Sequence, residues 1–433
     1  MKKVYIETYG CQMNVADTEV VFSILGGCGY ERCETMDEAD VIMANTCSVR
    51  DNAEARVLGR IEQFRLQRRN RPVLTGILGC MAERMKEQLL GKVDIVAGPD
   101  SYRKLPQMLE RAFAGEPRME VELSREETYA EIIPKRIDRN GVSAFISIMR
   151  GCNNVCSYCI VPFTRGSERS RDHSSIVREA CACKSDGYKE ITLLGQNVDS
   201  YLDADGVNFA KLLAMVAEAV SGVRVRFSTS HPKDISDELI ETMAKYPNIC
   251  HQIHLPVQSG SDRMLEKMRR RYTREWYLGR VRKIREAMPD CAISTDVIAG
   301  FCSETPEDHK LTLSLFEEVA FDSAYMFQYS ERPGTLAARN YPDDVPAAEK
   351  TRRLEEIIAL QNRLSMESNR RDIGKVFEVL VEGPSKKGDG QLCGRTGSGK
   401  MCVWEDSAHK EGDFVDVRVV SCTQATLFCE LLQ

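Results

Sequence analysis

The sequence has no long apolar run, no export signal and no excess of positive charge. No stretch approaches the roughly 18 consecutive apolar residues that indicate a transmembrane helix. The first residues, Met1 to Glu7, are typical of a β-strand and not of a signal peptide. The 59 basic and 65 acidic residues leave a net charge of −6, so a nucleic-acid partner requires a local basic patch. These absences argue against a membrane or secreted protein and predict a cytoplasmic one.

Cysteine is abundant by contrast. The chain has 17 cysteines among 433 residues, which is length enough for about three domains at roughly 150 residues each. Disulfides seldom persist in a reducing cytosol, so these thiols are expected to bind metal, to act in catalysis or to be small buried apolar groups. Their spacing and context separate these classes.

Residues 1–120 alternate short apolar runs with helix-length amphipathic segments. Strands are predicted at 4–9, 41–44, 73–78 and 93–96, and helices near 15–28, 51–69, 81–90 and 101–114. Such alternation is typical of a parallel sheet covered by helices, so an N-terminal α/β domain is expected. The charged, weakly periodic residues 121–139 are predicted to be a linker.

Two further domains are expected. Residues 140–371 form a second βα series, with strands predicted at 144–149, 190–195, 223–229, 250–257, 292–298 and 323–329. Six βα units predict a (βα)6 partial barrel, closed by a long helix from Lys350 to Arg371. In residues 372–433, short alternating strands separated by Gly-rich turns predict a small all-β barrel.

Three cysteines follow the first strand of the predicted partial barrel. Cys152, Cys156 and Cys159 have the spacing C-x3-C-x2-C on one short loop. Three such thiolates can bind three irons of a cubic iron–sulfur cluster and leave the fourth iron open to an external ligand. The alternatives are a zinc site or three incidental cysteines, but zinc needs a fourth ligand, and the next one along the chain is His173. The motif therefore predicts a [4Fe–4S] cluster.

A second set of cysteines is dispersed along the N-terminal domain. Cys11, Cys47 and Cys80 each come directly after a predicted strand. The carboxyl ends of parallel strands form one ligand-binding edge, so these three thiols are expected to converge. The alternative, buried structural cysteine, is reasonable for one of them and less so for three in equivalent positions. A second three-cysteine cluster is predicted here.

The segments around both sets resemble a known family. These are Glu7 to Asn14, Asn45 to Arg50, Gly79 to Met81, and Arg150 to Asn154 with Cys159 to Pro162. Together they resemble the radical S-adenosylmethionine (SAM) methylthiotransferases, and most narrowly the branch that acts on tRNA. The resemblance covers essentially the whole chain, with the C-terminal barrel corresponding to the family's RNA-binding TRAM domain. Ser167 and Cys302 depart from the commoner family pattern, but neither is a predicted cluster ligand.

The resemblance implies an activity. The expected reaction is methylthiolation of ring carbon C2 of N6-isopentenyl-adenosine at position 37 of tRNA, beside the anticodon. The cluster on the barrel loop would cleave SAM to a 5′-deoxyadenosyl radical, and the N-terminal cluster would hold the sulfur, methylated by a second SAM. Because an unactivated C–H bond requires cofactor radical chemistry, no side chain is assigned as catalytic.

The resemblance and the barrel's active face also suggest SAM contacts. Strand-end positions are expected to bind SAM, and two further side chains are expected to flank its adenine. The strand-end candidates are Gly195, Gln196, Asn197, Ser230, Gln258 and Asp296, and the flanking ones are Tyr158 and Ile298. Polar strand-end residues often bond loop backbone instead, which is the alternative at each position.

RNA contacts are expected where basic residues are dense. Residues 263–285 contain ten basic and two acidic residues, with Arg269, Arg270 and Arg271 beside Tyr272. A solvated face is the alternative. Further candidates lie after the cluster loop (Arg165, Arg169, Arg171) and in the small barrel (Lys386, Lys387, Arg395, Lys400).

Other partners and rival activities follow from the same resemblance. A flavodoxin- or ferredoxin-like electron donor and a cluster-assembly or sulfur-supply system are expected, acting on a monomer. Rivals within the family would modify threonylcarbamoyl-adenosine in tRNA or an aspartate of a ribosomal protein. An RNA-binding electron-transfer or iron-sensing protein is the rival from another class, but its clusters would be fully ligated by cysteine or exposed.

Overall fold

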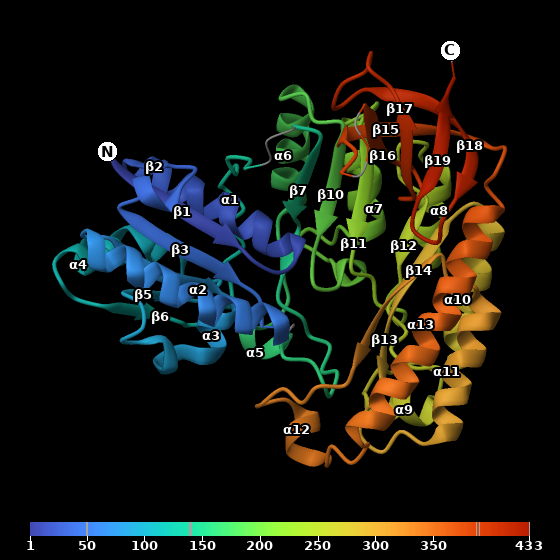
Figure 1. Ribbon diagram of the computed structural model, residues 1–433, viewed down its shortest axis with the longest axis horizontal. Helices are drawn as coiled ribbons and strands as arrows, with labels where there is room; N and C mark the ends of the chain where they lie inside the picture. The colour runs from blue at the N-terminus through green and yellow to red at the C-terminus, as the bar shows by residue number, and fades with distance from the viewer. Residues whose placement is uncertain (49–50, 138–140, 387, 389, 433) are drawn as a thin grey trace.

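The computed structural model describes residues 1–48, 51–137, 141–386, 388 and 390–432, arranged as three bodies in chain order (Figure 1). The first is a six-stranded sheet of order β2-β1-β3-β4-β5-β6, with every neighbouring pair parallel. Its strands are β1 Lys2–Thr8, β2 Tyr30–Arg32, β3 Val41–Thr46, β4 Leu74–Gly79, β5 Ile95–Ala97 and β6 Arg118–Glu120. The predicted parallel α/β domain is confirmed. The sequence analysis missed β2 and β6, because these three-residue edge strands carry no apolar run.

Helices cover both faces of this sheet. They are α1 Gln12–Gly27, α2 Asp51–Asn70, α3 Cys80–Met85 and α4 Leu105–Phe113, with short 3-10 turns η1 Met36–Glu38, η2 Lys86–Leu89 and η3 Tyr102–Lys104. Every residue of β3 and of β4 is buried, as expected for central strands of a parallel sheet. Because β1, β3 and β4 are neighbours, their carboxyl ends share one edge.

The central body is the predicted partial barrel. Its six strands form two parallel three-stranded sheets, β11-β10-β7 and β12-β13-β14, joined by a bridge between Val225 and Ile249. The strands are β7 Ser143–Ser147, β10 Glu190–Leu194, β11 Arg224–Ser228, β12 Gln252–His254, β13 Ala292–Ala299 and β14 Ser323–Gln328. A two-stranded ribbon, β8 Met149–Arg150 with β9 Arg169–Ser170, flanks the cysteine loop.

Helices surround the outside of the strands (Figure 1). The longer ones are α6 His173–Ser185, α7 Phe209–Ala219, α8 Asp237–Lys245, α10 Arg274–Ala287, α11 Pro306–Val319 and α13 Ala347–Arg370. The shorter ones are α5 Val161–Arg165, α9 Asp262–Lys267, α12 Leu336–Asn340 and the 3-10 turn η4 Val198–Ser200. Most of the large apolar core lies between these helices and the strands.

The C-terminal body is a closed barrel of order β15-β16-β17-β19-β18. Its strands are β15 Val376–Pro384, β16 Gln391–Thr396, β17 Met401–Glu405, β18 Phe414–Cys422 and β19 Leu427–Leu431, packed around buried Trp404. Two arginines of β11 hold it against the central body. Arg224 Nη1 donates to Arg395 O at 2.7 Å, and Arg226 Nη2 donates to Thr396 O at 2.8 Å.

The described part of the predicted linker, residues 121–137, is packed between the first two bodies. Tyr129 is buried and stacks on Tyr102, with ring centroids 5.8 Å apart. Arg136 pairs with Glu19 of α1 at 2.8 Å and with Glu179 of α6 at 2.6 Å. This segment therefore joins the two bodies through buried contacts. Within the described residues, no helix is both long and apolar enough to cross a membrane.

Candidate active site

The C-x3-C-x2-C motif forms a compact loop between β8 and α5. Gly151 has φ +76°, and a Cβ on it would lie 2.0 Å from Ser167 O, so only glycine fits there. Cys152 and Cys156 are buried. Burial raises the pKa of the Cys152 thiol to about 11 and that of Cys159 to about 12. Thiolates in such a place need positive charge nearby, which a bound metal supplies.

One arginine contacts this loop from outside the motif. Arg270 Nη1 lies 3.4 Å from Cys156 Sγ as a donor, and Arg270 Nη2 donates to Pro256 O at 2.7 Å. Its Nε donates to the hydroxyl of Tyr272 at 3.1 Å. All three nitrogens of Arg270 thus have acceptors, one of them a motif sulfur.

The three dispersed cysteines are brought together at the shared edge of β1, β3 and β4. A Cβ on Gly10 would lie 2.4 Å from Cys47 Cβ, so the Cys11 turn passes directly over Cys47. A hydrogen bond with Cys47 and the charge of Arg165 together lower the pKa of the Cys11 thiol to about 6, against the opposing effect of burial. Arg165 Nε also donates to Cys80 Sγ at 3.2 Å. Arg165 thus contacts the Cys80 thiol and acts electrostatically on the Cys11 thiol, which in turn bonds Cys47.

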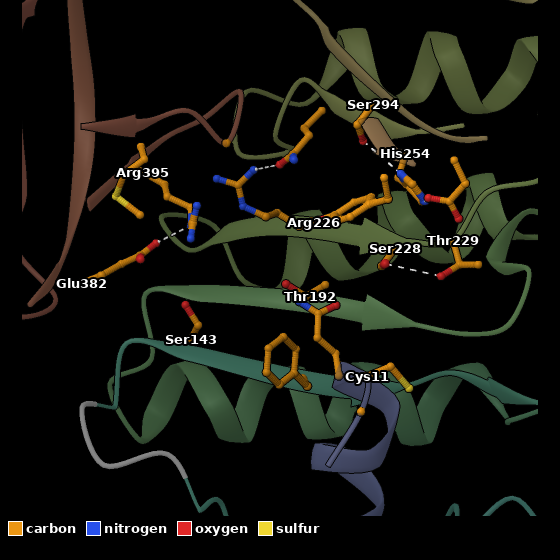
Figure 2. A pocket seen from close by; sticks show the side chains of 18 of the residues that line it. Cys11, Ser143, Thr192, Arg226, Ser228, Thr229, His254, Ser294, Glu382 and Arg395 are labelled. Carbon is orange, nitrogen blue, oxygen red and sulfur yellow. Dashed lines mark hydrogen bonds and ion pairs between the residues drawn. The ribbon is translucent and has the colours of Figure 1, made fainter. Parts of the chain in front are cut away.

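A cavity of about 1630 Å³ connects the three bodies (Figure 2). Cys11 of the N-terminal body, Cys159 of the cysteine loop and Arg395 of the C-terminal barrel all line it. The lining includes Arg226 in the middle of β11 and Ser228 at its end, so the cavity runs along the second half of this barrel strand. It therefore extends from the small β-barrel to both cysteine triads.

Polar side chains and strained backbone mark the cavity wall. His254 Nδ1 lies 3.0 Å from Ser294 Oγ, and its Nε2 lies 3.4 Å from Asp296 Oδ1 (Figure 2). Thr229 and Gln258 line the cavity with φ of +75° and +69°, values that non-glycine residues rarely adopt. Such conformations concentrate at functional sites, where surrounding structure enforces them.

The predicted SAM contacts divide into two groups. Tyr158, Gln258, Asp296 and Ile298 line the cavity. The other four are not among the lining residues: Gly195, Gln196 and Asn197 follow β10, and Ser230 follows β11.

Within the second group, local structure explains much of the residue choice. A Cβ on Gly195 would lie 2.6 Å from Met149 Cγ, so packing alone requires glycine there. Asn197 Nδ2 donates to Asp234 Oδ2 at 2.8 Å, and Ser230 Oγ donates to Asp199 Oδ1 at 3.0 Å.

Polar atoms without hydrogen-bond partners lie just past the carboxyl ends of β10 and β11. Gln196 Oε1, Asn197 Oδ1 and His231 Nε2 are buried without a hydrogen-bond partner among the described residues. Buried polar atoms normally have partners. The His231 ring also packs edge-on against Tyr272, with centroids 5.8 Å apart, and so adjoins the side chains around Cys156. This set fits a polar ligand bound beside the cysteine loop.

Four arginines predicted to contact RNA lie in the interior instead. Arg165 pairs with Asp17 at 2.8 Å and Arg169 with Asp100 at 3.0 Å. Arg171 pairs with Glu179, and Arg270 is engaged as described above. All four are buried, so the expectation of phosphate contacts is corrected for them. Their physical role is to neutralise buried carboxylates or to donate to sulfur and backbone oxygen.

The remaining RNA candidates have varied positions. Arg269 and Arg271 are exposed, with φ of +58° and +60°. Lys386 and Arg395 line the cavity, and Arg395 Nε lies 3.1 Å from Glu382 Oε1 (Figure 2). Lys400 Nζ pairs with Asp372 at 2.6 Å and so ties the small barrel to the end of α13. Lys387 lies outside the described residues.

Two aromatic residues of the cavity wall were not expected from the sequence. Tyr325 and Phe327 of β14 line the cavity while 56% and 39% exposed, respectively. Residues two apart on a strand share a face, so the Tyr-Met-Phe spacing in a predicted barrel strand was the signal that could have found them. His254 and Arg226 were also missed, since one histidine or arginine within a strand gives no distinctive pattern.

Family models match all three bodies. Residues 3–98 match Uncharacterized protein family UPF0004, residues 146–316 the Radical SAM superfamily and residues 370–432 the TRAM domain. Among solved structures, the radical S-adenosylmethionine methyltransferase TsrM from Kitasatospora setae is similar with a TM-score of 0.59. That alignment covers 78% of this chain and 77% of TsrM at 14% identity, which shows a shared fold.

Curated relatives are much more similar in sequence. A protein of Phocaeicola vulgatus named tRNA-2-methylthio-N(6)-dimethylallyladenosine synthase is 57% identical over 98% of this chain and 95% of its own length. A protein of the same name from Porphyromonas gingivalis (strain ATCC BAA-308 / W83) is 55% identical over 100% of this chain and 95% of its own length. At this identity and coverage, the chain belongs to the radical SAM methylthiotransferase family of tRNA-2-methylthio-N(6)-dimethylallyladenosine synthases.

Proposed function

We propose that this chain adds a methylthio group to C2 of N6-dimethylallyl (isopentenyl) adenosine at position 37 of tRNA. The proposal rests on one cavity that is lined by Cys11, Cys159 and Arg395. Arg395 belongs to the small barrel that matches the TRAM domain, an RNA-binding type of barrel. A target base in this cavity lies between two cysteine triads. The relatives' shared name supplies the substrate class.

The two triads are the proposed cluster ligands. Cys152, Cys156 and Cys159 would hold one [4Fe–4S] cluster, and Cys11, Cys47 and Cys80 the other. Three converging thiols at each site fit a cluster with one open iron. When bound, the clusters and SAM supply the radical that removes the C2 hydrogen, and the sulfur and methyl group that replace it. The protein itself binds, orients and shields the reactants.

The cavity wall suits a purine with a prenyl group. Tyr325 and Phe327 present exposed aromatic faces on which a base can stack. Phe145 and Phe227 add apolar surface for the dimethylallyl group. An anticodon-loop base is already partly unstacked, so moving it into the cavity costs less than extruding a base from a duplex.

Polar residues of the same wall are proposed to hold SAM. Gln258, Asp296, Tyr158 and Ile298 lie in the part of the wall that includes Cys159. Gly195, Gln196, Asn197 and Ser230 do not line the cavity, but the buried, unpartnered side-chain oxygens of Gln196 and Asn197 could accept hydrogen bonds from a ligand beside them. The interaction of His254 with Asp296 orients that carboxylate toward the cavity.

Exposed basic residues are proposed to contact the RNA backbone. Lys386 and Arg395 lie where the cavity meets the small barrel, and Arg269 and Arg271 lie on the surface beside the cysteine loop. The electron would come from a flavodoxin- or ferredoxin-like protein and the sulfur from a cluster-assembly or sulfur-supply system. We propose a cytoplasmic monomer with domains 1–120, 140–371 and 372–433 and the joining segment 121–139.

Mass spectrometry of tRNA nucleosides tests the proposal directly. Anaerobic incubation of the reconstituted protein with SAM, a reductant and tRNA carrying dimethylallyl-adenosine should yield 2-methylthio-N6-dimethylallyladenosine. Parallel reactions with threonylcarbamoyl-adenosine tRNA and with ribosomal protein distinguish the rival activities. Product only in one of those reactions would overturn the proposed substrate.

A further inference from the structure

A buried arginine of the central body reaches into the N-terminal triad. Arg165 is the last residue of α5, which follows the cysteine loop, and its side chain is only 4% exposed. Its Nε donates to Cys80 Sγ at 3.2 Å, although Cys80 belongs to the other body. The contact links the chain segment after one triad to a ligand position of the other.

The guanidinium is held in place by acidic and amide groups of α1. Arg165 Nη2 donates to Asp17 Oδ2 at 2.8 Å and to Asn14 Oδ1 at 3.2 Å. The same Asn14 oxygen accepts from Cys11 Sγ at 3.4 Å, so Arg165 contacts Cys80 directly and Cys11 through Asn14. Arg150 also pairs with Asp17 at 2.8 Å, which fixes the carboxylate that orients Arg165.

The third nitrogen indicates that the protein alone does not satisfy this side chain. Nη1 is buried without an acceptor among the described residues, as is Oγ of Ser48, directly after Cys47. Both atoms are hydrogen-bond donors, and leaving a buried donor unpaired is unfavourable. Two spare donors beside three thiols match a ligand rich in acceptors, as the sulfides of an iron–sulfur cluster are.

We propose that Arg165 is a positioning residue that raises the reduction potential of the cluster on Cys11, Cys47 and Cys80, an inference that rests on the proposed function. Hydrogen bonds to cluster sulfurs and nearby positive charge stabilise the reduced, more negative form. Because Arg165 comes from the central body, the potential of the N-terminal cluster depends on how the two bodies are docked. Arg270 makes the corresponding contact at Cys156, but from within the body that holds that triad.

The test is a redox titration of the full chain, with both clusters loaded, followed by electron paramagnetic resonance. Arg165→Gln removes the charge and the donor to Cys80, and the midpoint potential of the N-terminal cluster should fall. Arg165→Lys keeps the charge and should give an intermediate value. A variant with Cys152, Cys156 and Cys159 all changed to Ala assigns which signal belongs to the N-terminal cluster.

Arg169→Gln is the matched control. Arg169 lies in the same segment, is equally buried and pairs with Asp100 of the N-terminal body, but contacts no cysteine sulfur in the described hydrogen bonds. Its loss should leave the potential unchanged, whereas a general loosening of the bodies would shift both variants.

Three other outcomes decide the matter. Equal potentials in Arg165→Gln and the unchanged protein would overturn the inference and leave Arg165 as an ion-pair partner of Asp17. Arg165→Gln could fail to fold or could lose the cluster. The midpoint potential is then measured in folded Arg165→Lys, and a value equal to that of the unchanged protein would also overturn the inference. Iron for only one cluster in the unchanged protein would instead contradict the proposed function.

Discussion

The two cysteine triads differ in how the chain assembles them. Cys152, Cys156 and Cys159 share one loop, so any fold that places the loop also places all three thiols. Cys11, Cys47 and Cys80 follow three different strands and meet only because β1, β3 and β4 are neighbours in one parallel sheet. The first triad is a local property of the sequence, and the second is a property of the sheet.

The electrostatic surroundings of the two triads also differ. Burial raises the pKa of Cys152 to about 11, whereas a hydrogen bond with Cys47, aided by Arg165, lowers the pKa of Cys11 to about 6. Burial also raises the pKa of Cys80, so both triads depend on bound metal to stabilise their thiolates, with Arg270 beside Cys156 as the cation nearest the loop sulfurs. The dispersed triad receives part of that stabilisation from Arg165, which the other body contributes.

The largest expected effect separates the triads by function. A variant with Cys11, Cys47 and Cys80 all changed to Ala should make no methylthio product but should still cleave SAM to 5′-deoxyadenosine. The variant lacking Cys152, Cys156 and Cys159 should make neither, yet should still accept a methyl group from SAM on the N-terminal cluster. Chromatography of nucleosides and of SAM products measures both, and product from the first variant would contradict the division.

Iron content tests whether the triads are independent. Removing either triad should leave about half of the iron of the reconstituted protein, because the ligands are in separate bodies and each site folds around its own metal. Colorimetric analysis of the folded variants measures the iron bound per protein chain. Loss of nearly all the iron from one triple variant would show that the sites are coupled.

Asp17→Asn tests the dependence of the dispersed triad on docking. Asp17 accepts from both Arg150 and Arg165 in the interior, and these arginines lower its pKa although burial alone would raise it. Removing one partner of a buried charge pair costs about 3–5 kcal/mol, so thermal unfolding should shift clearly downward. In contrast, Glu38→Gln, at an exposed pair with Lys3, should have little effect. Similar melting temperatures for the two variants would argue against a structural role for the Asp17 network.

Tyr325→Ala tests the cavity between the triads. Loss of one stacking face should weaken binding of dimethylallyl-adenosine tRNA by about 1–3 kcal/mol without changing iron content. Fluorescence anisotropy with an anticodon stem-loop measures the change, and Tyr325→Phe, which keeps the ring, should restore most of it. Unchanged affinity in Tyr325→Ala would place the base elsewhere.

The smallest effect concerns exposed charge beside the cysteine loop. Changing Arg269 and Arg271 to Gln should reduce the slope of log affinity against log salt by up to about 0.9 for each lost phosphate contact on a duplex stem, or about 0.7 on a single strand. Lys245 and Lys310, exposed on α8 and α11, give a control pair of the same charge change. An equal slope in both double variants would make the Arg269 region a solvated face.

The arginines show where prediction from sequence stopped. Arg165, Arg169 and Arg171 were expected to contact phosphates because they form a local group of basic residues just after the cluster loop. Their acidic partners Asp17 and Asp100 are far away in the chain, and no local pattern announces the pairing. A sequence shows which side chains are charged. Whether a charged side chain is buried depends on which surfaces of the folded bodies pack together.

The sequence by itself determined the three folds and the strand-end position of each dispersed cysteine, and it predicted the six cluster ligands, because periodicity and spacing are local. Only the tertiary structure decided that one cavity joins both triads to the small barrel, and that Arg165 of one body contacts Cys80 of the other. Relations between bodies depend on packing of side chains distant in sequence, such as Arg226 on Thr396 and Arg136 between Glu19 and Glu179. Such contacts join residues that no local sequence pattern pairs.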